Sequence, residues 1–229
     1  SRESTSYLYD GVCTPMFERT DEWTAETNLT TPGTPNQKVT RSILRAPDYG
    51  PVFATATVEG EPVALAIQRS TFFGEPDSVT TFVGVSRNEV VDPESFFEAF
   101  NGLTGVFNWM YVDAENIAYF NSGLLPKRAA GIHPDLPQWG TGEYDWDQTQ
   151  TGTLNPDFSF DNFLPLESHP REINPESGYI VQWNNAQAPG FWAHDTQTGW
   201  GPTYRSVMLA SRLQAFRESD GNQLHTRAR

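Results

Sequence analysis

Tight-turn sequences divide the first seventy residues into short runs of strand-forming residues. Asp10-Gly11 and Glu59-Gly60-Glu61 are the clearest turns, because glycine tolerates the positive φ that a tight hairpin loop requires. Short runs joined in this way pair as antiparallel hairpins, so the segment predicts a small antiparallel β unit. The expected strands cover residues 7–9, 12–14, 38–45, 51–58 and 62–69, with a loop over the Asn-, Thr- and Pro-rich residues 25–37.

Helix signals enter after residue 75. Asp92-Pro93-Glu94-Ser95 has an aspartate cap, a proline at the first helical position and an acidic residue in the first turn. Phe96, Phe97 and Phe100 follow at helical spacing, which indicates one buried face, and Gly102 ends the helix. Further patterns predict a helix over residues 77–86 capped by Asp77, strands over 106–112 and 117–120, and a last helix over 203–217 with an apolar face of Val207, Met208, Leu213 and Phe216.

Together these elements predict an α+β protein with a boundary near residue 75. Residues 1–75 form the small antiparallel β unit, and residues 76–229 hold the helices and the remaining strands. Residues 123–176 are dense in Pro, Gly, Asp and Asn. A structureless loop of this length is uncommon, so we expect an ordered excursion that lies over a surface.

The composition excludes several classes of protein. The 229 residues carry a formal net charge of −14, which is unsuited to nucleic acid because phosphate binding needs clustered lysine and arginine. No apolar run is long enough to span a membrane. Cys13 is the single cysteine, so no intrachain disulfide is possible, and we interpret it as a small apolar strand residue. The four histidines lack the spacing of a metal pair.

The segment from Asn174 to Asn185 combines turn chemistry with an amide pair. Asn174-Pro175 and Ser177-Gly178 are turn sequences, whereas Tyr179–Val181 favours an extended strand. Asn184-Asn185 ends this strand, and an amide at the end of a buried strand can donate a hydrogen bond to a developing oxyanion. A plain turn after a strand contains the same residues, so the pattern alone leaves both interpretations open.

Two other groups of residues allow a functional interpretation. Glu143, Asp145 and Asp147 surround Trp146, and such a cluster either binds a cation or belongs to a solvated acidic surface. With 29 acidic residues in the chain, we favour the surface. The second group consists of tryptophans, which would make the chain a non-catalytic binding module for a glycan or small ligand. Its stacking platforms would be Trp139, Trp146, Trp183 and Trp192.

Four stretches together resemble the β chain of the penicillin acylase family, one of the N-terminal nucleophile hydrolases. Phe107–Tyr119 (FNWMYVDAENIAY) is similar to the family's N-[WF]-x-Y-A-D-x-x-G-N-I-G-Y, with Glu115 and Ala118 where the family has glycine. Residues 123–128 (GLLPKR), 140–146 (GTGEYDW) and 174–185 (NPESGYIVQWNN) are similar to G-x-x-P-x-R, G-T-G-x-W-D-W and N-P-x-S-G-Y-I-x-x-W-N-N. The four motifs occur in the family's order, which makes the resemblance specific.

The resemblance implies a fold, a reaction and a set of site residues. The fold is part of the αββα core of these hydrolases, beside the small β unit. In the family, an N-terminal serine exposed by autoproteolysis attacks the acyl carbonyl of an N-acylated amine, and a backbone N–H and an Asn side chain bind the oxyanion. By position, Asn184 is that donor, Arg205 orients it, and Phe107 lines the acyl pocket.

The resemblance also implies partners, a metal and a compartment. Ser1 heads a polar stretch without strand character, so it is not the expected nucleophile. We therefore expect an internal segment that is inactive alone and assembles with the α chain and the remainder of the β chain of one precursor, outside the cell or in the periplasm. The substrate would be a small N-acyl compound such as a β-lactam or an acyl homoserine lactone. A calcium ion would take the Pro134 carbonyl and Asp195 as two of its ligands, and calcium prefers several oxygens more.

Overall fold

The computed structural model of the chain describes residues 4–27, 30, 32–33, 35–71, 75–134, 136–146, 163–191 and 203–220. These residues form two compact units. The first unit contains the described residues up to 70, together with Lys127–Ile132 and residues 136–146. The second unit contains the described residues of 71–126, residues 133–134, and the described residues from 163 onward.

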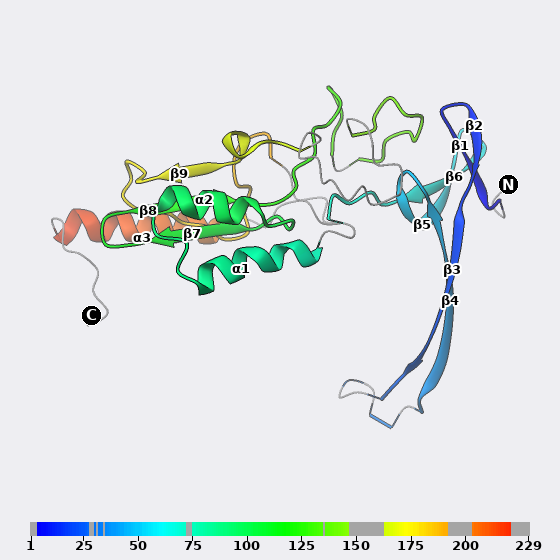
Figure 1. Cartoon of the computed structure of the whole chain (residues 1–229), viewed down its shortest axis with the longest axis horizontal. Helices are drawn as coiled ribbons and strands as arrows, with labels where there is room; N and C mark the ends of the chain where they lie inside the picture. The colour runs from blue at the N-terminus through cyan, green and yellow to red at the C-terminus, as the bar shows by residue number, and fades with distance from the viewer. Residues whose placement is uncertain are drawn as a thin grey trace. The chain divides into compact units, whose positions relative to one another are not determined.

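The described part of the first unit is built from strands (Figure 1). They are β1 (Ser6–Tyr9), β2 (Val12–Pro15), β3 (Phe17–Ala25), β4 (Gln37–Ala46), β5 (Gly50–Val58) and β6 (Glu61–Ala66). β1 pairs with β2, and β3 to β6 form a four-stranded antiparallel sheet in chain order. At the β1–β2 turn, Asp10 and Gly11 have φ values of 46° and 75°, as a tight hairpin requires. The hairpins expected from the turn sequences are therefore confirmed, and Cys13 lies exposed in β2.

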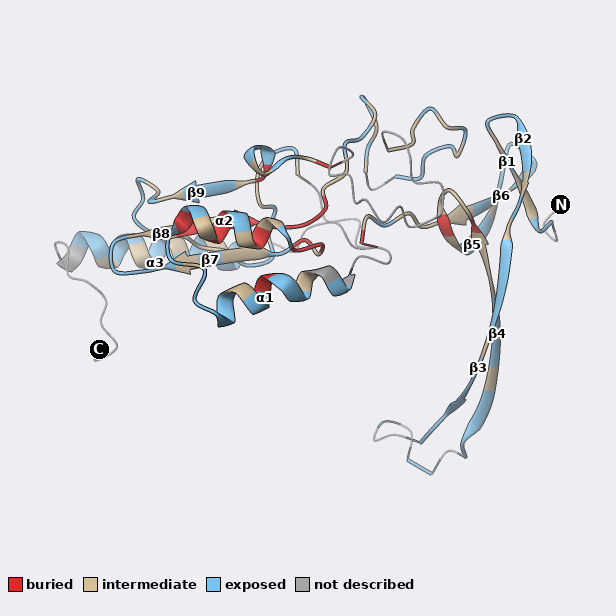
Figure 2. Cartoon of the chain, viewed as in Figure 1, coloured by how far each residue is buried: buried red, intermediate tan, exposed pale blue. Residues whose placement is uncertain are grey.

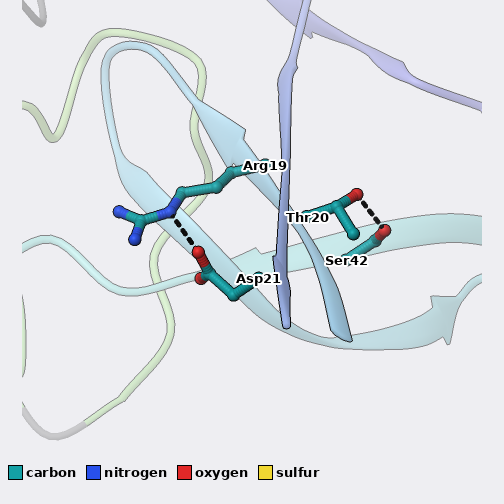
Figure 3. A network of polar contacts seen from close by, with 4 residues as sticks. All are labelled: Arg19, Thr20, Asp21 and Ser42. Atoms are coloured by element: carbon teal, nitrogen blue, oxygen red, sulfur yellow. Dashed lines mark hydrogen bonds and ion pairs between the residues drawn. The ribbon is translucent and has the colours of Figure 1, made fainter. Parts of the chain in front are cut away.

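β3 and β4 form a long ribbon in which every residue of β3 has a partner in β4. Figure 3 shows polar contacts on this ribbon: Arg19 Nε donates to Asp21 within β3 at 2.7 Å, and the hydroxyls of Thr20 and Ser42 bond across the two strands at 2.7 Å. The sequence pattern does not predict β3, because polar side chains occupy both of its faces. It therefore lacks the alternation that marks a half-buried strand.

The second unit combines a three-stranded antiparallel sheet with helices (Figure 1). The sheet has the order β7 (Asn108–Val112), β8 (Ile117–Asn121) and β9 (Arg171–Ile173). The helices are α1 (Val79–Ser86), α2 (Pro93–Asn101) and α3 (Tyr204–Asp220), with short 3-10 turns η1 (Glu75–Ser78) and η3 (Leu166–Ser168). Antiparallel sheets with a few helices confirm the α+β class. Among the described helices, none is long and apolar enough to cross a membrane.

α2 begins and ends where the sequence predicts. The Ser95 N–H donates to Asp92 Oδ1 at 2.7 Å and the Asp92 N–H donates to Ser95 Oγ at 3.0 Å, so each residue satisfies a backbone donor of the other. Gly102 follows as the cap at the other end. The buried face of α2 packs into a hydrophobic core made of Phe96, Phe97, Phe100, Leu103, Ala118 and Phe120. Figure 2 shows buried residues concentrated on α2 and on nearby segments of the second unit.

Three expectations about local structure are wrong. Tyr179–Val181 forms no strand, because a strand needs a backbone partner and none of the described strands pairs with this segment. Val207 and Met208 of α3 are 60% and 52% exposed, and Leu213 and Phe216 are only half-buried, so the predicted stripe is not a buried face. α1 is preceded by η1, so its cap residue is Ser78 and not Asp77.

Candidate functional site

A tight turn presents Asn184 to solvent. Gln182 bridges the turn with its side-chain amide: Oε1 accepts from the Asn185 N–H at 3.0 Å, and Nε2 donates to the Asn185 carbonyl at 3.3 Å. Asn185 Oδ1 in turn accepts from the Trp183 N–H at 3.0 Å. The flanking side chains thus hold the shape of the turn without using the Asn184 side chain.

The backbone of Asn184 has a conformation that suits an asparagine. Its φ is 44°, in the left-handed region that Asn adopts more readily than other non-glycine residues. The residue is exposed, and its side chain makes no hydrogen bond to any residue that the structure describes. An amide held on a firm turn with unused N–H groups is a donor that can bind a negatively charged oxygen.

Arg205 packs on the residue that precedes Asn184. It lies in the first turn of α3, and its guanidinium carbon is 3.9 Å from the centre of the Trp183 ring, a cation–π contact. A cation in the first turn of a helix is opposed by the helix dipole, and the Trp183 ring offsets that penalty. Arg205 thus acts on the neighbour of Asn184, whereas direct orientation of the Asn184 amide stays a prediction.

Phe107 combines a fixed backbone with an exposed ring. The residue directly precedes β7, is 59% exposed, and meets the Trp109 ring edge-on with 6.0 Å between the ring centres. The Ser122 N–H and Asn121 Nδ2 both donate to the Phe107 carbonyl, at 3.0 and 3.2 Å. The side chain is therefore available for contact with a bound molecule while its main chain is held in place.

Buried amides connect the Phe107 strand with the Asn184 turn. Asn121, at the end of β8, is 1% exposed. Its Nδ2 also donates to Asn108 Oδ1 at 3.0 Å, and its Oδ1 accepts from Gln187 Nε2 at 3.4 Å. Gln187 follows Asn184 by three residues, so the structure joins the predicted pocket residue and the predicted donor in one network of the second unit.

Tyr119 belongs to the same network. Its hydroxyl donates to Asn108 Oδ1. Burial raises the pKa of Tyr119 to about 12, and a hydrogen bond with Gln182 partly opposes this rise. The phenol therefore stays protonated at neutral pH and remains a hydrogen-bond donor within the network.

Sequence reasoning did not identify Asn121, Ser122 or Gln187. Polar residues after an apolar strand usually mark its exit into solvent, yet Asn121 and Ser122 are 1% and 0% exposed. One signal was available in the sequence, the glycine at position 123. In the structure its φ is 119°, and a Cβ there would lie 2.5 Å from a methyl carbon of Val106. Such a close approach of two segments buries the residues beside it.

Of the two predicted calcium ligands, Pro134 can be located and Asp195 lies outside the described residues. Pro134 lies in the second unit and offers only a main-chain carbonyl. Among the residues described, no group of three or more His, Cys, Asp or Glu side chains is arranged to hold a metal ion. Any calcium site would therefore need oxygen ligands beyond this part of the chain.

Of the acidic residues around Trp146, Asp145 makes structural contacts in the first unit, and Asp147 lies outside the described residues. Asp145 accepts hydrogen bonds from the hydroxyls of Tyr9 and Tyr49, each at 2.8 Å and each on a different carboxylate oxygen. Arg128 lies over the Trp146 ring at 5.6 Å. Because both oxygens of Asp145 already accept, the contacts favour a structural role over a cation site.

The arginine contacts also bear on the alternative of a glycan-binding module. Trp146 and Trp183 each have an arginine over one ring face, and Trp192 lies outside the described residues. Trp139 is 57% exposed. A stacking platform needs an open ring face. Arginines cover one face of Trp146 and of Trp183, so among the described residues the exposed Trp139 is what supports this alternative.

The whole chain matches one protein-family model, penicillin amidase, over residues 1–229. Among curated proteins, it is 38% identical over 89 residues to penicillin G acylase of Escherichia coli, which covers 38% of this chain and 9% of that protein. It is 26% identical over 208 residues to the acyl-homoserine lactone acylase QuiP of Pseudomonas syringae pv. tomato, which covers 90% of this chain and 22% of that protein.

A solved structure agrees with this match. The thermostable penicillin G acylase from Alcaligenes faecalis superposes with a TM-score of 0.69 at 23% identity, covering 94% of this chain and 34% of that one. At this identity the likeness shows the fold. The chain spans 9% to 22% of the length of the two curated relatives. Since the family model covers every residue and the fold agrees with it, the chain belongs to the penicillin amidase family.

Proposed function

We propose that this chain is part of the β chain of an acylase precursor whose assembled form hydrolyses the amide bond between an acyl group and an amine. The substrates would be small N-acylated amines of the acyl homoserine lactone or β-lactam type. Support comes from membership of the penicillin amidase family and from the names of the relatives, a penicillin G acylase and an acyl-homoserine lactone acylase.

In the proposed reaction, an N-terminal serine on a segment outside this chain attacks the acyl carbon. The serine oxygen forms a bond to that carbon while the carbonyl oxygen takes up the electron pair, and Asn184 Nδ2 donates to the resulting oxyanion. The serine proton passes through the serine's own α-amine to the leaving amine as the C–N bond breaks. Water then hydrolyses the acyl-serine ester, which releases the carboxylic acid and restores the serine.

The observation that carries this proposal is the amide of Asn184, whose N–H groups bond to none of the residues that the structure describes. Its turn is held by Gln182 and Asn185, so the backbone that carries the donor is in place before a substrate arrives and needs little reorganisation when charge develops. In the same proposal, Arg205 steadies the turn through Trp183. Phe107 contacts the acyl group through its exposed ring.

The direct test replaces Asn184 by glycine in the full-length protein. Asn184→Gly removes the amide but keeps the positive φ of 44° without strain, so the fold should be unaffected. We expect kcat for a chromogenic N-acyl anilide to fall by about 10²–10³, the usual effect of losing one oxyanion donor. The thermal midpoint should change little.

Asn88→Gly is the matched control, because Asn88 is also exposed and left-handed, with φ 58°, but belongs to the turn after α1. It should leave kcat and KM unchanged. Equal activity of Asn184→Gly and the unmodified protein would remove Asn184 from the mechanism. Serine-dependent turnover by residues 1–229 alone would contradict the proposal that the nucleophile lies outside this chain.

We further propose that the assembled enzyme works in the periplasm or outside the cell and that it binds calcium. The Pro134 carbonyl and Asp195 would supply two hard oxygen ligands, with the rest from other segments. Addition of a chelator should lower the thermal midpoint of the full-length protein, and calcium should restore it. A midpoint that chelation leaves unchanged would contradict the calcium proposal.

A further inference from the structure

Two polar side chains lie deepest in the described part of the second unit. Asn121 is 1% and Ser122 is 0% exposed, and with Phe120 they are the largest fully buried side chains described. Burial of an amide and a hydroxyl costs free energy unless each is hydrogen-bonded. Their bonding partners therefore indicate what these two residues hold in place.

Ser122 holds the main chain at Phe107 from two sides. Its hydroxyl donates to the Gly105 carbonyl at 2.8 Å and accepts from the Phe107 N–H at 3.3 Å and from Trp109 Nε1 at 3.0 Å. This uses the one donor and both acceptor positions of the hydroxyl. The Ser122 N–H adds a bond to the Phe107 carbonyl at 3.0 Å.

Asn121 links this anchored segment to the turn that carries Asn184. Both N–H groups of its amide are used, one on the Phe107 carbonyl at 3.2 Å and one on Asn108 Oδ1 at 3.0 Å. Its oxygen accepts the long bond from Gln187 at 3.4 Å. Its own main chain is fixed by the Pro170 carbonyl, to which the Asn121 N–H donates at 2.9 Å.

Gln187 makes the longest hydrogen bond in the link between Asn121 and the Asn184 turn. Its Nε2 contacts Asn121, while its Oε1 is buried and has no hydrogen-bond partner among the residues described. An unpaired buried oxygen is destabilising. A residue present only for stability would be better apolar at this position, so the amide is explained by the contact that it makes with Asn121.

We propose that Asn121 and Ser122 are a pair of positioning residues that sets the placement of Phe107 relative to Asn184, with Gln187 as the connection. This inference rests on the proposed function, in which Phe107 contacts the acyl group and Asn184 binds the oxyanion. Ser122 then governs acyl-chain selectivity through Phe107. Asn121 and Gln187 govern the chemical step through the Asn184 turn. Neither residue of the pair touches the substrate.

The test uses Gln187→Met in the full-length protein, measured on p-nitroanilides that carry a butanoyl or a decanoyl chain. Methionine matches the length of glutamine and removes the unpaired oxygen, so stability should be unchanged or slightly higher. We expect kcat to fall about tenfold with KM nearly constant, because misplacement of a reacting group costs rate rather than binding. In an Asn184→Gly background this loss should disappear.

Ser122→Ala tests the other half of the pair. We expect it to change the ratio of kcat/KM for the two chain lengths by about fivefold, and we expect no such change in a Phe107→Ala background. Asn174→Gly is the matched control: Asn174 directly follows β9, bonds the Ile117 N–H at 3.0 Å and should alter stability only. If Ser122→Ala does not fold, Gln187→Met carries the test alone.

The outcomes separate the two proposals. If the wild type is active and the losses in kcat caused by Gln187→Met and Asn184→Gly multiply in the double variant, the positioning role is overturned. The proposed function then remains intact. The same holds if Gln187→Met leaves kcat unchanged. A full-length wild type that hydrolyses neither anilide overturns the proposed function and this inference with it.

Discussion

At the scale of single residues, the fate of the side chain separates Asn184 from Asn174, another left-handed asparagine. Asn174 has a similar φ of 50°, but both polar atoms of its amide are bonded: Oδ1 accepts from the Ile117 N–H at 3.0 Å, and Nδ2 donates to Asn116 Oδ1 at 2.8 Å. The Asn184 amide bonds to no residue that the structure describes, because its neighbours hold the turn. A positive φ is therefore a turn signal, and the proposed function additionally requires that the amide on that turn is not used within the chain.

The tyrosines that bind Asp145 give a pH prediction at this scale. The hydrogen bond to Asp145, followed by burial, raises the pKa of Tyr9 to about 12, and burial followed by the same carboxylate raises the pKa of Tyr49 well above its ordinary value of 10.0. The unfolded chain then loses these protons first as the pH rises. Stability should be full below about pH 10 and should decline from there through the folded pKa values.

Urea midpoints across the alkaline range and the phenolate absorbance check this prediction. Tyr9→Phe and Tyr49→Phe should each make the alkaline loss of stability shallower, because one raised pKa is removed. Tyr204→Phe is the control, since Tyr204 is 60% exposed and its hydroxyl bonds to no carboxylate among the residues that the structure describes. A wild-type slope that neither variant changes would contradict the assignment.

At the scale of elements, the second unit depends on the packing of α2 against β8. Phe120 of β8 is fully buried, lies 5.6 Å from Phe97 ring to ring, and stacks on His169 at 5.4 Å. His169 is itself buried and bonds the Asn121 carbonyl at 2.8 Å through Nδ1. The aromatic core therefore borders directly on the amide network.

Phe120→Ala should cost about 3–5 kcal/mol of unfolding free energy, as large-to-small changes at buried phenylalanines do. Phe82→Ala on α1 makes the same chemical change at a residue that is 48% exposed, and should cost less than about half as much. Urea unfolding of both variants measures the difference. Similar losses at the two positions would contradict the description of the core.

The sequence predicts elements well where periodicity and cap chemistry agree, as at Asp92 and the phenylalanines of α2. It fails where pairing with a distant segment determines the structure of a stretch. Tyr179–Val181 has strand-forming residues but no pairing strand among the described residues, and β3 pairs fully although polar side chains occur on both of its faces. At the site, motif resemblance identified Asn184 as a candidate donor. It missed Asn121, because burial of a polar side chain depends on distant segments.

At the scale of the whole molecule, the two units differ in how their secondary structure is protected. β8 is half-buried or buried at every residue, whereas eight of the nine residues of β3 are exposed. Figure 2 shows the same contrast in colour, with β3 and β4 pale along most of their length. Exposed ion pairs such as Lys38 with Glu22 contribute little to the stability of such a ribbon.

Hydrogen exchange should reveal this difference. Amides of β3 and β4 should exchange through local opening at least about tenfold faster than those of β7 and β8, because few apolar contacts must break to open the ribbon. β5 and β6 serve as an internal comparison, since they belong to the same sheet as the ribbon. Equal protection of β3 and β8 would contradict the prediction and would indicate that the ribbon is covered in solution.

The anchored main chain at Phe107 has a consequence for redesign of the protein. Three hydrogen bonds fix the peptide groups on either side of an outward-facing ring, so we expect position 107 to tolerate different side chains. Replacement of the ring by a smaller or larger group alters the volume at that point and leaves the path of the chain unchanged. A series of substitutions at position 107 therefore measures how much volume is available to a molecule that contacts this side chain.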